Sequence, residues 1–106
     1  MSCQWADMDL DTLCAKAADM GYDGIELAIW GNHLDPIRAA QDDAYVEEIK
    51  AIFQRHGLVV KALCAHVPSQ CVGDWNDPRL NNFAPAHLAD DPAGIRAWAI
   101  ETMKAA

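Results

Sequence analysis

Apolar residues in the first part of the chain recur with the period of an amphipathic helix, three, four and seven positions apart. They are Leu10, Leu13, Cys14, Ala17 and Met20. Asp9 suits the N-cap of such a helix, and Gly21 suits the left-handed position after its end. The pattern predicts a helix over residues 10–20, and a short apolar strand over 23–30 follows it directly.

The same alternation of helix and strand continues along the chain. A helix is expected over about 43–56, closed by Gly57, with an inner stripe of Val46, Ile49, Ile52, Phe53 and His56. A strand over 58–66 follows, and the last helix opens at Asp91-Pro92 and buries one face made of Ile95, Trp98, Ala99, Thr102 and Met103. Apolar strands alternating with helices predict an α/β fold with a parallel sheet covered by helices.

The connection over 67–90 is long, rich in Pro, Asn and Asp, and without an obvious element of its own. Connections of this length in compact domains usually carry function. This one leaves the carboxyl end of the second strand, which is where parallel α/β folds place their sites. We therefore expect ligand-contacting residues in it.

Strand alternation raises the question of the acid at position 26. Ile25, Leu27 and Ile29 point to one face of the first strand, and the opposite face holds Glu26, Ala28 and Trp30. An inward carboxylate costs several kcal/mol unless it is paired or hydrogen-bonded. Either Glu26 forms an ion pair with an Arg or Lys of another strand, or it contacts a polar ligand in the mouth of a barrel.

Histidines offer a second group of candidates. In the second strand one face is expected to contain Val60, Ala62, Cys64 and His66. His66 at the strand tip is either a hydrogen-bonded structural histidine or a contact to substrate or metal. His33 and His87 lie in loops and are weaker candidates, and His56 suits a partner of a helix carboxyl end.

Composition narrows the class of protein. The chain has 106 residues, 52% of them hydrophobic and 23% charged, which fits one modest core and a single domain. Its formal net charge of −8 argues against nucleic-acid binding, because no basic stripe is present. The first residues do not form a signal peptide, and no apolar run is long enough to cross a bilayer, so we expect a cytoplasmic protein without membrane contacts.

The four cysteines include no CxxC pair. Cys14 and Cys64 fit small buried apolar residues. A zinc site could be assembled from Cys64, His66, Cys71 and His87, although this spacing matches no structural-zinc signature.

Three stretches carry a family resemblance: "GYDGIEL" at the entry to the first strand, "CAH" at the end of the second, and the final "DDPAGIRAWAIETMKAA". In this order, over residues 8–106, the chain resembles the opening portion of the xylose isomerase-like TIM barrels. That superfamily contains sugar and sugar-phosphate isomerases and epimerases. The resemblance implies a partial (β/α)8 barrel with two to three βα units and parallel strands.

The resemblance also implies a site. Family chemistry uses a divalent metal, which would be Mg, Mn, Co or Zn, and carboxylates that move a proton beside a carbonyl. The positions that match a pocket for a sugar or sugar phosphate are the inward acid Glu26, the strand-exit residues Trp30 and His33, His66, and the loop residues Asp74, Trp75 and Asp77.

The chain departs from the family in its size. A complete barrel takes about 250 residues, and only Met1 to Ala6 precede the first helix, in the place of a first strand. Residues 1–106 are thus expected to form a single incomplete barrel domain, an N-terminal fragment that is inactive alone, with no metal ligands or catalytic acids that can be placed. Alternatives are a non-catalytic assembly module, which could form homo-oligomers through exposed strand edges, and a small metal-binding protein.

Overall fold

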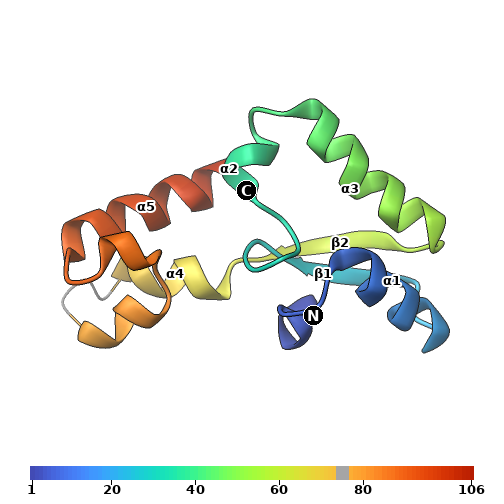
Figure 1. Cartoon of the computed structure of the whole chain (residues 1–106), viewed down its shortest axis with the longest axis horizontal. Helices are drawn as coiled ribbons and strands as arrows, with labels where there is room; N and C mark the ends of the chain where they lie inside the picture. Colours follow the sequence, from blue (N-terminus) through green and yellow to red (C-terminus); the bar gives the residue numbers. More distant parts are fainter. Residues whose placement is uncertain (74–76) are drawn as a thin grey trace. The chain divides into compact units, whose positions relative to one another are not determined.

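The computed structural model describes residues 1–73 and 77–106, and the chain falls into two compact units, Met1–Cys64 and Ala65–Ala106. The first unit contains η1 (Ser2–Trp5), α1 (Leu10–Asp19), β1 (Gly24–Ala28), α2 (Pro36–Ala39), α3 (Asp43–Arg55) and β2 (Val59–Cys64) (Figure 1). The second contains α4 (His66–Gly73), η2 (Pro78–Asn82), η3 (Ala86–Leu88) and α5 (Pro92–Ala105). The elements form an α/β fold with parallel strands, as predicted.

The ends of the long helices are set by short-range chemistry. A carboxylate oxygen of Asp9 accepts the backbone N–H of Thr12 at 2.9 Å and caps α1. Asp42 caps α3 in the same way, and Asp91 caps α5. Gly21 and Gly57 follow α1 and α3 with φ values of 82° and 67°, a backbone conformation that favours glycine. These boundaries agree with the predicted ones to within about two residues.

β1 and β2 pair in parallel with one irregularity. Ile25 lies opposite Val60, but Glu26 lies opposite Ala62, so Lys61 is an extra residue at a bulge. The extra residue shifts the alternation of β2, and Val60 consequently shares a face with Ile25. The prediction that Val60 lies on the Cys64 face is therefore wrong. The face that contains Glu26 is shared by Ala28, Ala62 and Cys64.

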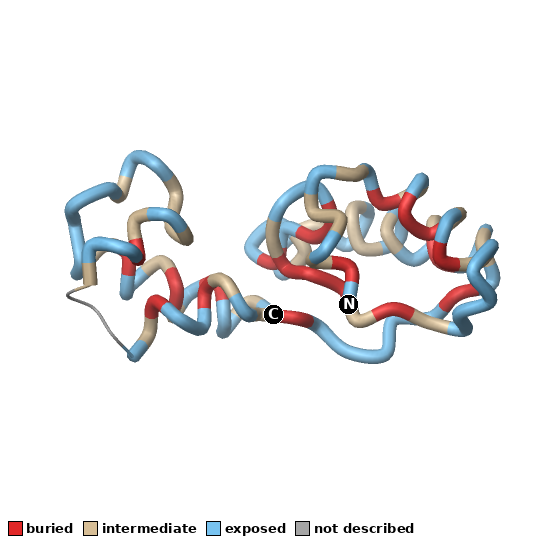
Figure 2. Tube along the Cα trace, turned by 90° about the horizontal axis from the view of Figure 1, so that it is seen from below, coloured by how far each residue is buried: buried red, intermediate tan, exposed pale blue. Residues whose placement is uncertain are grey.

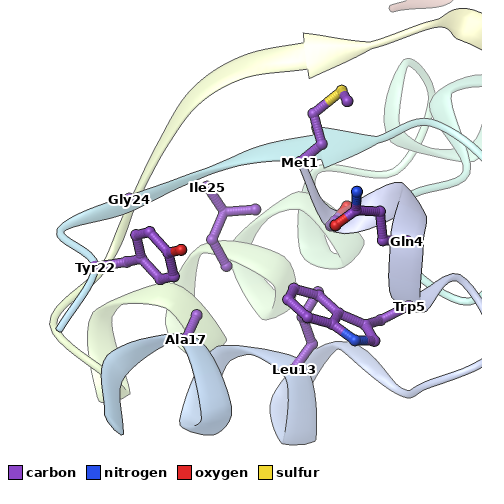
Figure 3. Close-up of a pocket in the computed structure, with 9 residues that line it drawn as sticks. Met1, Gln4, Trp5, Leu13, Ala17, Tyr22, Gly24 and Ile25 are labelled. Carbon is purple, nitrogen blue, oxygen red and sulfur yellow. The ribbon is translucent and has the colours of Figure 1, made fainter. Parts of the chain in front are cut away.

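The opposite face of β1 packs on α1. Ile25 and Leu27 are 7% and 1% exposed, and Figure 3 shows Ile25 directed towards Leu13 and Ala17 of α1. Full burial of a side chain of this size contributes about 1.5–3 kcal/mol. Buried positions recur along α1 and β1 as red segments of the tube in Figure 2. The core of the first unit therefore lies between β1 and the helices.

Helix α3 is less buried than its sequence pattern predicts. Of the expected inner stripe only Phe53 is buried, at 3% exposed, while Val46, Ile49 and Ile52 are half-buried. Its carboxyl end is tied to α1 by Asp11, whose Oδ1 lies 2.7 Å from Nη1 of Arg55 and 2.9 Å from Nε2 of His56. His56 thus contacts a carboxylate of α1 in addition to closing its own helix.

The segment before α1 forms the 3-10 helix η1 in the place where a first strand was considered. Ser2 is 1% exposed, and its Oγ accepts the backbone N–H of Ala28 at 2.8 Å. A backbone N–H on the free edge of β1 is thereby satisfied by a side chain instead of a neighbouring strand.

The second unit differs from its prediction at the start. His66 does not continue β2, which ends at Cys64; it is the first residue of α4. Pro68 is compatible with this helix because its missing N–H falls in the first turn, where backbone N–H groups have no helical partner. The prediction of a strand over 58–66 is wrong for residues 58, 65 and 66.

The connection over 67–90 is also more structured than predicted, since it contains most of α4 together with η2 and η3. Cys71 and Leu80 pack there with Ile95 and Ala99 of α5 in a small apolar core. Arg96 adds a hydrogen bond from Nε to the carbonyl of Val72 at 3.1 Å. On α5 the expected inner residues Ile95, Ala99 and Thr102 are buried, whereas Met103 is 40% exposed.

Within residues 1–73 and 77–106, no helix has both the length and the apolar character needed to cross a bilayer.

Candidate functional site

Glu26 occupies the middle of β1 and is half-buried. In the described part of the chain, none of the ion pairs includes Glu26. Among residues 1–73 and 77–106, no Lys or Arg therefore forms the ion pair that would explain this buried acid. Contact with a polar ligand stays the prediction for Glu26.

The neighbours of Glu26 on its sheet face are small. Ala28 lies two residues along β1, and Ala62 lies directly opposite on β2. Methyl side chains offer no hydrogen-bonding group, so neither alanine can pair with the carboxylate. Small residues low on a strand with an acid beside them agree with the expected inner face of a barrel.

Cys64 lies on the same face of the sheet as Glu26. It ends β2 opposite Ala28, is 1% exposed, and its Sγ lies within 4.8 Å of a carboxylate oxygen of Glu26. Oxygen and sulfur ligands of one tetrahedral zinc ion are about 3.5 Å apart. The two side chains therefore count among the potential metal ligands of the described residues.

Sequence reasoning did not associate Cys64 with Glu26. It placed Cys64 correctly on the Ala62 face, but the relation between β1 and β2 requires the register, and the register includes a bulge. The sequence does contain one signal for this pairing. Ala62 and Cys64 alternate along β2 as Glu26 and Ala28 alternate along β1, so each pair lies on one face of its strand.

His66 follows Cys64 by two residues, opens α4 and is exposed. Its carbonyl accepts hydrogen bonds from Oγ of Ser69 at 3.2 Å and from Nε2 of Gln70 at 2.9 Å. Among the described residues, Glu26, Cys64 and His66 are the group of His, Cys, Asp and Glu side chains that could hold a metal ion. That Glu26 and His66 contact one ligand stays a prediction.

Trp30 and His33 lie in the segment after β1. Trp30 is half-buried, whereas His33 is only 1% exposed. Nε2 of His33 lies 3.1 Å from the carbonyl oxygen of Met8, and its Nδ1 has no hydrogen-bond partner among the described residues. His33 is therefore part of the interior of the first unit, and its predicted contact with substrate is untested.

Asp74 and Trp75 lie outside the described residues. Asp77, which was grouped with them, caps η2 by accepting the backbone N–H of Arg79 at 2.9 Å. Its carboxylate also pairs with the guanidinium of Arg79. Hydrogen bonds from the Arg79 side chain lower the pKa of Asp77 from 3.8 to about 2, so this acid is ionised at neutral pH.

The alternative zinc set finds no support beyond Cys64 and His66. Cys71 is fully buried in the apolar core of the second unit, and burial raises the pKa of its thiol. His87 lies in the short helix η3 and is exposed. In the described ranges neither residue belongs to a group of three potential metal ligands.

A separate hollow lies between η1, α1 and the start of β1, with a volume of about 160 Å³ (Figure 3). It is bordered by the rings of Trp5 and Tyr22, the amide of Gln4, and Ile25. No charged side chain lines it. A largely apolar hollow of this size can take a side chain or a small apolar group.

Comparison with known protein families identifies a match. The profile of the family described as "Xylose isomerase-like TIM barrel" matches residues 14–106. A search of curated proteins finds no match to the chain.

Proposed function

Because the chain belongs to the xylose isomerase-like TIM barrel family, we propose that it contributes parallel strands and a sugar-contacting acid to a barrel that isomerises or epimerises a sugar or sugar phosphate. The observation that carries this proposal is Glu26, a half-buried carboxylate without an ion-pair partner among the described residues, on a sheet face of small side chains. Such a carboxylate is suited to accept hydrogen bonds from sugar hydroxyls.

The remaining residues have separate roles in this proposal. His66 donates to or accepts from a second oxygen of the sugar, and Trp30 supplies an apolar wall beside β1. His33 acts from inside the first unit by holding the segment after β1 against the Met8 carbonyl.

A divalent metal, when bound in the family barrel, polarises the carbonyl and hydroxyl of the substrate. Proton transfer at the neighbouring carbon also needs carboxylates at a suitable distance. The described residues supply two parallel strands, whereas a closed barrel has eight. We therefore propose that residues 1–106 form one incomplete barrel domain that binds substrate weakly and does not turn it over alone.

The test combines binding and turnover on the purified chain. Saturation-transfer NMR with a panel of aldoses, ketoses and their phosphates should show weak, saturable binding. Glu26→Gln should weaken binding at least tenfold, since a hydrogen bond to a charged group is worth roughly 1.5–3 kcal/mol. Glu48→Gln, an exposed acid on α3, is the matched control and should leave binding unchanged.

Turnover is followed by proton NMR in D₂O, where isomerisation or epimerisation exchanges the proton beside the carbonyl. With Mg²⁺, Mn²⁺ or Co²⁺ the isolated chain should show no exchange above buffer. Robust metal-dependent exchange would refute the proposal that this chain is inactive alone. No saturable binding of any sugar by the folded chain would refute the sugar site itself.

A second candidate function, assembly, is favoured by β2. Val59, Val60 and Leu63 are 48%, 42% and 39% exposed, although the apolar sequence of this strand predicts burial. A strand edge with exposed apolar side chains can pair with another chain, including a second copy. A defined dimer in sedimentation analysis that dissociates in Val60→Lys would support this function, and a monomer at all concentrations would exclude it.

A further inference from the structure

We propose that the hollow between η1, α1 and the start of β1 is a binding site for a small neutral aromatic molecule about the size of phenol. The residues that line it lie within the first unit, Met1–Cys64. Ile25 borders the hollow, whereas Glu26 points to the opposite face of β1. The hollow is therefore separate from the proposed sugar site, and the inference does not depend on the sugar function.

The inner side of the hollow is apolar and buried. Leu13 and Ala17 on α1 and Ile25 on β1 are 1%, 4% and 7% exposed, and Figure 3 shows the three side chains around the hollow. The volume is about 160 Å³, and an apolar protein cavity of about 150 Å³ can bind a benzene molecule. The space therefore suits a single six-membered ring with a small substituent.

Two aromatic side chains determine the class of ligand. The indole of Trp5 borders the hollow from η1, and the ring of Tyr22 borders it from the turn before β1 (Figure 3). The Lys16 ammonium lies 5.9 Å from the centroid of the Trp5 ring, and the backbone N–H of Tyr22 donates to the Ala17 carbonyl at 3.1 Å. Aromatic rings attract one another beyond the effect of buried area. These walls therefore favour an aromatic ligand over an aliphatic one of the same size.

The polar groups at the border determine the charge and orientation of the ligand. The Gln4 amide and the Tyr22 hydroxyl can each donate and accept a hydrogen bond. The described residues that line the hollow include no Lys, Arg, Asp or Glu. A neutral ring with one hydroxyl group can pair with Gln4 or Tyr22 and bury the rest of its surface. A charged ring would give up water without gaining a side chain of opposite charge.

A ligand in the hollow would also hold η1 in place. Ser2, Gln4 and Trp5 line the hollow from η1, and Oγ of Ser2 accepts the backbone N–H of Ala28 at 2.8 Å. A molecule that contacts η1, α1 and β1 together binds best when all three are in position, so it shifts the population towards that state. Binding should therefore slow hydrogen exchange of the Ala28 amide. Tyr22 is 60% exposed, so a ligand can enter beside its ring.

The experiment is a titration of the ¹⁵N-labelled chain with phenol, followed by ¹H–¹⁵N NMR. We expect saturable shifts of the Trp5 indole N–H and the Gln4 side-chain amide, together with slower exchange of the Ala28 amide. Cyclohexanol has nearly the same size without an aromatic ring, and it should bind about fivefold more weakly or less. Benzoate, which is charged, should not compete with phenol.

Variants test the two rings. Tyr22→Ala and Trp5→Leu should each weaken phenol binding by about fivefold or more. The matched control is Met20→Ala, because Met20 is 53% exposed, lies just after α1 and does not line the hollow. Circular dichroism checks the folding of each variant. Tyr22→Ala replaces an exposed side chain, so the test does not depend on whether Trp5→Leu folds.

The proposal is overturned if the folded chain shows no saturable shifts, if cyclohexanol binds as tightly as phenol, or if Tyr22→Ala binds phenol as tightly as Met20→Ala. Shifts of the same N–H groups when the chain is concentrated without phenol would show that a side chain of a second copy fills the hollow, which would also overturn it. Glu26→Gln should bind phenol unchanged, because Glu26 points to the other face of β1. Failure of the sugar proposal would therefore leave the phenol result standing.

Discussion

The hydroxyl of Ser2 gives a quantitative test of how η1 completes the free edge of β1. Ser2 and Ala28 are 1% and 0% exposed, and the Ser2 Oγ accepts the Ala28 N–H at 2.8 Å. Ser2→Ala removes the acceptor and leaves a backbone N–H in a place that water does not reach. An unsatisfied buried donor costs about 1–3 kcal/mol. For a domain of this size each kcal/mol lowers Tm by roughly 4–8 °C.

The assay is urea unfolding followed by circular dichroism, together with hydrogen exchange of the Ala28 amide by NMR. Ser2→Ala should lower the free energy of unfolding by about 1–3 kcal/mol. It should also accelerate hydrogen exchange of the Ala28 amide. The matched control is Ser69→Ala, whose exposed hydroxyl donates to the His66 carbonyl, and its free energy should change by less than about 0.5 kcal/mol. A Ser2→Ala effect no larger than that of the control would refute the role assigned to η1.

Three further predictions concern stability and charge. Leu13 is 1% exposed, so Leu13→Ala should lower the free energy of unfolding in urea by about 2–5 kcal/mol. A loss below about 1 kcal/mol would contradict the packing of α1 on β1. Gly57→Ala should cost about 1 kcal/mol because φ is 67°, whereas Gly73→Ala, at a helix end with open space, should be neutral or stabilising. The pKa of Asp77 is depressed to about 2, so its contribution is complete above pH 4 and is lost as pH falls towards 2; NMR titration of Arg79→Gln should show that pKa rising towards 3.8, and an unchanged value would contradict the pairing.

Features that depend on neighbouring residues could be predicted from the sequence. The start of α1 at Asp9 needs only the Thr12 N–H, and the end of α3 at Gly57 needs only a left-handed residue. The cap at Asp91 is equally local. The order of helices and strands, and hence the α/β class with parallel strands, follows from these local signals and the apolar period.

Features that depend on contacts between residues far apart in the sequence could not be predicted from it. The bulge at Lys61 appears only when β2 is aligned with β1, and it moves Val60 to the other face. The end of β2 was missed for a related reason: the residue before a proline favours extended backbone, yet Val67 precedes Pro68 within α4. The burial of His33 results from the Met8 carbonyl, 25 positions away in the sequence.

The candidate site shows the same division. The alternation of β1 is enough to place Glu26 on the face opposite Ile25 and Leu27, and that placement is correct. The nearness of Cys64 to Glu26 needs the strand register, so sequence reasoning treated Cys64 as a small buried apolar residue or as a member of a different zinc set. A residue that packs well and also bears a thiol has no local signal that separates the two roles.

The central claim is that the Glu26 face of β1 is a sugar-binding face. Saturation-transfer NMR of the purified chain and of Glu26→Gln, with a panel of aldoses, ketoses and their phosphates, tests it most directly. The account predicts saturable binding by the chain and binding at least tenfold weaker by Glu26→Gln. Equal binding by the two proteins, or no saturable binding by the folded chain, would contradict it.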